Sequence, residues 1–134
     1  MRILLGLLLV AACSKSEPAK QAPSAPATSD PATAAARASK DPAKAKEMIA
    51  AGAVVIDVRT PDEYDTDHLA QATNIPIQDF SSRLADVEKL TGGDKAKPVV
   101  LHCAAGGRAG KAKKQLEDAG YTNVVNGGGL DDLK

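Results

Sequence analysis

Short apolar segments alternate with amphipathic segments from residue 41 to the end of the chain. Four segments predict strands: the continuous apolar run 53–58, a second buried strand at 98–102, a brief strand at 72–75 and a last one at 123–126. Four segments between and around them predict helices: 41–52, one beginning at residue 60, 80–90 and 108–119. Because strands alternate with helices, we expect an α/β domain whose sheet is mainly parallel and flanked by helices.

Capping residues support the expected helix boundaries. Asp41 followed by proline is typical of an N-cap and the first helical position. Thr60, with proline next and Glu63 three positions later, predicts a capping box. Gly120 predicts the end of the last helix.

The first twelve residues predict a leader rather than a part of the fold. A positive start at Met1 and Arg2 precedes an apolar run at 3–10. This run is shorter than the roughly 20 residues that a permanent membrane helix needs. Two alanines and Cys13 follow, an order that resembles the lipobox of bacterial lipoproteins. We therefore expect a lipoprotein signal peptide at 1–12 and lipidation of Cys13; the alternative is an ordinary signal peptide in which this cysteine is incidental.

Residues 13–40 predict a lipidated cysteine and a disordered tether. Positions 14–40 hold 9 Ala, 5 Ser and 4 Pro, and no Val, Ile, Leu or aromatic residue. Such a segment has too little apolar surface to offset the entropy of ordering it. By the lipoprotein rule, serine rather than aspartate after the cysteine favours the outer membrane. We therefore expect an extracytoplasmic protein, anchored in that membrane by its lipid and facing the periplasm.

Composition excludes several classes of function. The whole chain has 17 basic and 17 acidic residues and is 2% aromatic, whereas 41–134 has 12 basic and 15 acidic residues. Nucleic-acid binders need a positive field, and single-strand binders also need aromatic platforms, so no nucleic-acid partner is expected. Two cysteines are too few for a disulfide-stapled mini-protein. We expect one monomeric domain with an aliphatic core.

Cys103 follows a buried strand and precedes a helix, where ligand crevices form in parallel α/β sheets. Small residues and a cation come next: Ala104, Ala105, Gly106, Gly107 and Arg108. Such a loop lets several N–H groups converge, and with the helix N-terminus it stabilises an anion such as a nucleophilic thiolate. Further cations, including Lys111, lie early in this helix against the preference of its dipole, which fits an anionic substrate. The alternative for Cys103 is a small buried hydrophobe.

Three segments resemble the signatures of rhodanese-type sulfurtransferase domains. They are 57–64 with 68–76, the loop from His102 to Arg108, and 120–124 with the triple glycine at 127–129. The resemblance covers about residues 45–130 in the right order, and it is closest to the small single-domain extracytoplasmic members. It implies one rhodanese-like domain over 41–134.

The resemblance also implies a reaction. Cys103 would accept a sulfane sulfur from thiosulfate as a persulfide, release sulfite, and pass the sulfur to cyanide or a thiol. The amides from Ala104 to Arg108 would cradle the sulfur, and Arg108 would hold the negative end of the donor. No metal and no organic cofactor is implied. The expected partners are a small anionic sulfur donor, a thiol or cyanide acceptor, and the membrane through the lipid anchor.

Two features depart from the family pattern. Leu130 stands where an aromatic residue often follows the terminal glycines, and the strand that commonly opens these domains is not predicted.

Other polar residues are expected to be structural. His102 should face away from Cys103 across the strand, and His68, Asp57 and Arg59 should form structural hydrogen bonds. The acidic run from Asp62 to Asp67 lacks the glycine of a calcium loop and predicts a solvated face.

Two alternative functions remain open at this point. Cysteine phosphatases and arsenate reductases use a similar loop with five residues between cysteine and arginine, whereas four residues, 104–107, lie between them here. The tighter loop favours a single sulfur over a tetrahedral oxyanion. The other alternative is a carrier or binding module whose persulfide is delivered only to a docked partner.

Overall fold

The computed structural model describes residues 39–134. The expected leader at 1–12 lies outside the described residues, as do Cys13 and the expected tether up to residue 38. None of the helices between residues 39 and 134 is long and apolar enough to cross a bilayer.

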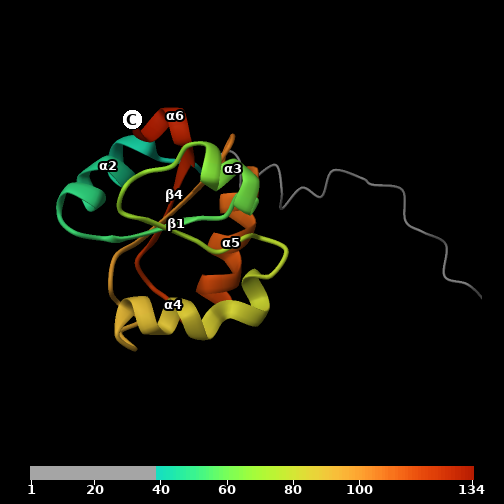
Figure 1. The fold of residues 1–134 in the computed structure, drawn as a ribbon. Coiled ribbons are helices and arrows are strands. Elements are labelled where there is room, and N and C mark those ends of the chain that lie inside the picture. Colours follow the sequence, from blue (N-terminus) through green and yellow to red (C-terminus); the bar gives the residue numbers. More distant parts are fainter. Residues whose placement is uncertain (1–38) are drawn as a thin grey trace, which may run out of the picture.

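A four-stranded parallel sheet forms the centre of the domain, in the order β2-β1-β3-β4 (Figure 1). Its strands are β1 (Val54–Asp57), β2 (Ala72–Asn74), β3 (Val99–Cys103) and β4 (Val124–Gly129). All five residues of β3 are buried, because β3 lies between two strands and is covered on both faces. The predicted class, a parallel sheet flanked by helices, is confirmed.

Two layers of helices cover the sheet. On one face, α4 (Leu84–Thr91) and α5 (Gly107–Asp118) bury the larger core cluster, which includes Ile56, Leu101 and Cys103. On the other face, α2 (Pro42–Ala50) and α6 (Leu130–Leu133) close a smaller cluster around Val100 (Figure 1). Alternate residues of β3 therefore face opposite layers, and Cys103 faces α4 and α5.

The helix boundaries follow the capping signals. The Asp41 carboxylate accepts the backbone N–H of Lys44 at 2.9 Å and starts α2. Thr60 and Glu63 form the expected capping box at the start of α3 (Pro61–Thr66). The segment predicted as one helix at 80–90 instead begins as the 3₁₀ turn η1 (Phe80–Arg83) before α4, as is common at the N-termini of α-helices.

The last strand is longer than predicted. It continues through the three glycines that were expected to follow it, and it leads directly into α6, which was not predicted. Gly127 and Gly129 have no side chains, so the strand can approach α6 on one side and the loop after β3 on the other. An opening strand was not expected, and at the start of the described residues an isolated parallel bridge joins Lys40 to Asn126.

Candidate active site

Cys103 is the last residue of β3 and lies at the N-terminal end of α5. Its side chain is 1% exposed, and the backbone N–H of Gly106 donates to its Sγ at 3.0 Å. The loop can turn into the helix because Gly106 adopts a φ of +93°, which side-chain-bearing residues rarely adopt. Glycine offers no side-chain cap, so the first amides of α5 remain available to an anion beside the thiol.

Strand β4 contacts this loop and fixes its position through a side-chain hydrogen bond. The Asn126 side chain is fully buried, and its amide donates to the Gly106 carbonyl at 2.9 Å while its Oδ1 accepts from the Gly128 N–H at 3.0 Å. Gly129 lies opposite Cys103 in the strand register. A Cβ on Gly129 would lie 2.5 Å from the Ala104 carbonyl oxygen, so only glycine fits at the existing distance.

Arg108 reaches across from α5 to α3. Its two terminal nitrogens donate to both carboxylate oxygens of Glu63, at 2.7 and 2.9 Å. These bonds raise the pKa of Arg108, and the nearby Cys103 sulfur raises it further. The same bonds, with those from Thr60, lower the pKa of Glu63 to about 2. In the run predicted as a solvated face, Asp62, Asp65 and Asp67 are exposed as expected, whereas Glu63 is half-buried and forms a two-bond ion pair with the arginine of the loop.

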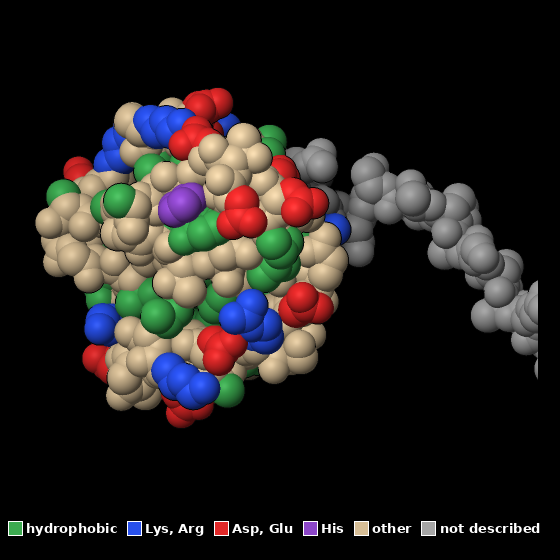
Figure 2. Space-filling model, in the orientation of Figure 1, with side chains coloured by type: hydrophobic (Ala, Val, Ile, Leu, Met, Phe, Trp, Pro, Cys, Tyr) green, Lys and Arg blue, Asp and Glu red, His purple; other side chains and the backbone are tan. Residues whose placement is uncertain are grey.

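Other cations of α5 are paired within the helix. Lys113 contacts Glu117 at 2.6 Å and Lys114 contacts Asp118 at 2.9 Å. These two charges are thereby compensated and Arg108 is paired with Glu63, so among the described residues the exposed Lys111 is the one cation of α5 without an ion-pair partner. Figure 2 shows positive and negative side chains interspersed over one face of the domain.

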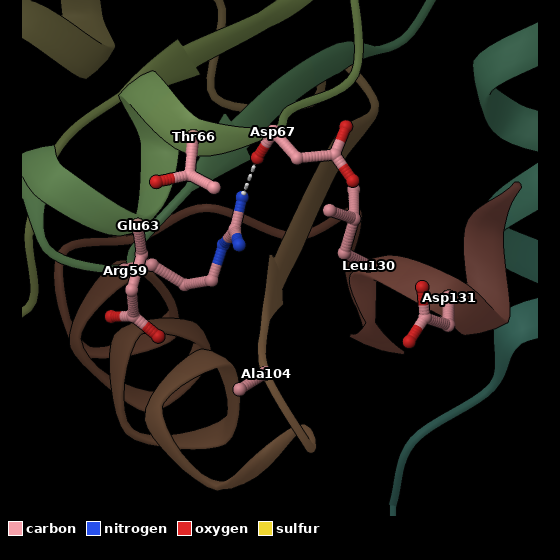
Figure 3. Close-up of a pocket in the computed structure, with 7 residues that line it drawn as sticks. All are labelled: Arg59, Glu63, Thr66, Asp67, Ala104, Leu130 and Asp131. Atoms are coloured by element: carbon pink, nitrogen blue, oxygen red, sulfur yellow. Dashed lines mark hydrogen bonds between the residues drawn. The ribbon is translucent and has the colours of Figure 1, made fainter.

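A pocket of about 360 Å³ opens beside the loop. Its lining residues come from α3 and the residues just before and after it, from the loop and from α6. They are Arg59, Glu63, Thr66, Asp67, Ala104, Leu130 and Asp131. Figure 3 shows Glu63 and Thr66 on one side of the pocket, Leu130 and Asp131 on the other, Asp67 at the top of the view and Ala104 at the bottom. A small molecule in the pocket would therefore lie against the loop that carries Cys103.

Comparisons with known proteins agree with this geometry. The model of the rhodanese-like domain family matches residues 41–132. This chain belongs to the rhodanese-like family.

Named relatives and a solved structure extend the match. The chain is 41% identical over 78 residues to the thiosulfate sulfurtransferase PspE of Escherichia coli K12, covering 58% of this chain and 71% of that protein. It is 35% identical over 78 residues to the thiosulfate:glutathione sulfurtransferase of Saccharomyces cerevisiae, covering 53% of this chain and 56% of the yeast protein. A structure described as rhodanese with anions from E. coli superposes with a TM-score of 0.52 at 41% identity, covering 58% of this chain and 87% of that one.

In this rhodanese-like domain, Asp57 and Arg59 form a buried ion pair. Arg59 donates three hydrogen bonds to the Asp57 carboxylate, at 2.7 to 3.1 Å, and one of 2.6 Å to the Asp67 carbonyl (Figure 3 shows the last). Asn74 donates to the carbonyls of both members of the pair. The expected structural role of these two residues is confirmed, and Arg59 also borders the pocket.

The histidines do not pair with the thiol. His102 is fully buried on the sheet face opposite Cys103, and neither of its ring nitrogens has a hydrogen-bond partner among residues 39–134. Burial lowers its pKa, and this outweighs the effect of Asp57, whose carboxylate lies 3.7 Å away. His68 stacks on Tyr64 with ring centroids 3.9 Å apart and bonds the Tyr64 carbonyl.

Two residues of the site were missed from the sequence. Asn126 was placed only as the end of a strand, and no local signal distinguished it from Asn123 at the start of the same segment. Glu63 had a signal, because a capping box holds its side chain at the start of α3. No group of three or more His, Cys, Asp or Glu side chains in 39–134 is arranged to hold a metal ion.

Proposed function

We propose that this rhodanese-like protein is a thiosulfate sulfurtransferase that works through a persulfide on Cys103. The observation that carries the proposal is the position of the Cys103 sulfur, 3.0 Å from the Gly106 amide at the N-terminus of α5 and close to Arg108. The names of its relatives in E. coli and yeast support the same reaction class.

The first half-reaction transfers sulfur to the enzyme. The Cys103 thiolate attacks the outer sulfur of thiosulfate, an Sγ–S bond forms, and the S–S bond of thiosulfate breaks. Sulfite leaves with the electron pair of that bond. The charges balance, because a thiolate and the thiosulfate dianion become a persulfide anion and the sulfite dianion. The amides of the loop and of the first turn of α5 stabilise the negative charge on the terminal sulfur.

The second half-reaction regenerates the thiolate. Cyanide or a thiolate attacks the terminal sulfur of the persulfide, and the bond to Sγ breaks with its electrons returning to Cys103. Thiocyanate or a new persulfide leaves. We expect the acceptor to approach through the pocket that Ala104, the residue after Cys103, lines.

Intact-protein mass spectrometry after exposure to thiosulfate tests the proposal. The full chain is used with Cys13→Ser, so that Cys103 is its only thiol, and Cys103→Ser in the same background is the control. We expect a gain of one sulfur atom that cyanide removes and that the control lacks. No gain would refute the proposal and favour assays with an aryl phosphate or arsenate, whereas loading without turnover would favour a carrier.

We also propose that Cys13 anchors the protein in the outer membrane. The support is the short apolar leader ending in two alanines before the cysteine, followed by serine. Cells fed radiolabelled palmitate should yield a labelled protein in the outer-membrane fraction. Cys13→Ser should abolish both the label and the recovery of the protein in the outer-membrane fraction. If the unaltered protein is unlabelled and absent from the membrane fractions, the anchor is contradicted.

A further inference from the structure

Both arginines beside the active-site loop are already paired with carboxylates. The terminal nitrogens of Arg108 are bound by the two oxygens of Glu63, at 2.7 and 2.9 Å. Arg59 is bound by Asp57 and by a backbone carbonyl. Arg59 and Glu63 line the pocket and Arg108 is bound to Glu63, so an anionic donor that enters the pocket approaches arginines whose charges are already compensated.

Glu63 is held in place independently of Arg108. Its carboxylate accepts the Thr60 backbone N–H at 3.0 Å and the Thr60 hydroxyl at 3.1 Å, as part of the capping box of α3. It also lines the pocket together with Ala104. The carboxylate is thus a fixed negative charge at the pocket wall, which stays beside Arg108 when a second anion approaches.

We propose that Glu63 determines the donor preference of the enzyme by competing with the sulfonate end of the donor for Arg108. This inference rests on the proposed sulfur transfer and adds a specificity-determining residue to it. A fixed carboxylate repels a dianion about twice as strongly as a monoanion at the same distance. Glu63 therefore shifts the balance from thiosulfate, a dianion, toward donors that carry a single negative charge.

The test replaces Glu63 by glutamine in the full-length chain and compares two donors. Thiosulfate carries two negative charges, and methanethiosulfonate carries one and releases methanesulfinate instead of sulfite. The specificity constant kcat/KM for each donor is measured at saturating cyanide, because in a two-step transfer it reports only the donor step.

Glu63→Gln should raise kcat/KM for thiosulfate by about two- to fivefold. The factor is modest because both side chains of the ion pair are about one-third exposed, so solvent weakens the interaction. The rise for methanethiosulfonate should be smaller, so the ratio of the two constants increases. A merely structural role for Glu63 would lower both constants and leave their ratio unchanged. An unchanged or reduced ratio overturns the proposal.

Asp62→Asn is the matched control. Asp62 lies in the same first turn of α3 and is exposed, and neutralising it changes the net charge equally without touching Arg108. Its donor ratio should equal that of the unaltered chain, and an increase equal to that of Glu63→Gln would overturn the specific pairing.

Glu63→Asp keeps the test decisive should the glutamine variant unfold. The shorter side chain keeps its charge but withdraws from Arg108, so the ratio should rise in the same direction by a smaller factor, and a fall would refute the proposal. Sulfur loading of the unaltered chain separates the two claims. Failure to load refutes the proposed function, whereas normal loading with an unchanged donor ratio refutes only the role of Glu63.

Discussion

Gly129→Ala should disable the active-site loop while the protein still folds. The backbone of Gly129 has φ −91° and ψ 166°, which alanine adopts freely, so the substitution adds no backbone strain. Its new Cβ, however, would lie 2.5 Å from the Ala104 carbonyl oxygen and 3.2 Å from the carbonyl carbon, whereas ordinary contacts lie at 3.4–4 Å. Backbone atoms cannot rotate away as a side chain can, so the loop must move by about 1 Å.

The size of the effect follows from this displacement. Overpacking of this kind costs about 1–3 kcal/mol of unfolding free energy, which a domain of ordinary stability survives. A misplacement of about 1 Å in a reacting group costs on the order of 100-fold in rate. We therefore expect the rate of sulfur loading on Cys103 to fall far more than the stability of the domain.

The assay combines urea unfolding with time-resolved mass spectrometry of the thiosulfate reaction. Gly127→Ala is the control, because its Cβ would meet the tip of Leu133 at 3.0 Å and Ala45 at 3.2 Å, away from the loop. It should lose a similar amount of stability and load sulfur at the rate of the unaltered chain. Loading of Gly129→Ala at that same rate would refute the inference that β4 sets the position of the loop.

Three further predictions concern the polar contacts around the site. Asn126→Ala removes the buried amide that bonds the Gly106 carbonyl, so it should cost about 1–3 kcal/mol in urea unfolding and slow sulfur loading; full retention of both would show that the loop does not need this bond. Asp57→Asn leaves the buried Arg59 cation without its carboxylate and should cost about 3–5 kcal/mol by the same measurement, with a loss below 1 kcal/mol contradicting a buried pair. The Glu63 carboxylate, whose pKa falls from 4.5 to about 2 on folding, contributes stability that is fully present above pH 4.5 and is lost as the pH falls through 2. The unfolding free energy of the chain minus that of Glu63→Gln should therefore shrink over this interval, and a difference that does not change with pH would exclude the ion pair.

Much of the fold could be predicted because its signals are local. The alternation of short strand-like segments with helical ones placed all four strands, and caps such as Asp41 and Thr60 placed helix starts. Errors arose where tertiary contacts override local preference. The last strand was predicted to end at residue 126, before the triple glycine, yet pairing with β3 and the close approach of the loop make these glycines part of β4.

The rhodanese-like family assignment was also predictable, because its signatures are contiguous motifs in a defined order. The family model matches residues 41–132, close to the segment 45–130 on which the resemblance rested, so the predicted family is confirmed. The roles proposed for the loop residues remain predictions, to be tested by the loading experiment.

The sequence by itself determined the order of the elements, the place of Cys103 between a buried strand and a helix, and the four-residue spacing to Arg108. These depend on residues near one another in the chain. Only the tertiary structure decided which distant groups meet the loop. Glu63 reaches Arg108 across 45 positions and Asn126 reaches Gly106 across 20, because strand order and register bring the ends of parallel strands to one edge of the sheet. The periodicity of a sequence specifies which face a side chain takes, whereas its partner depends on how separate elements pack together.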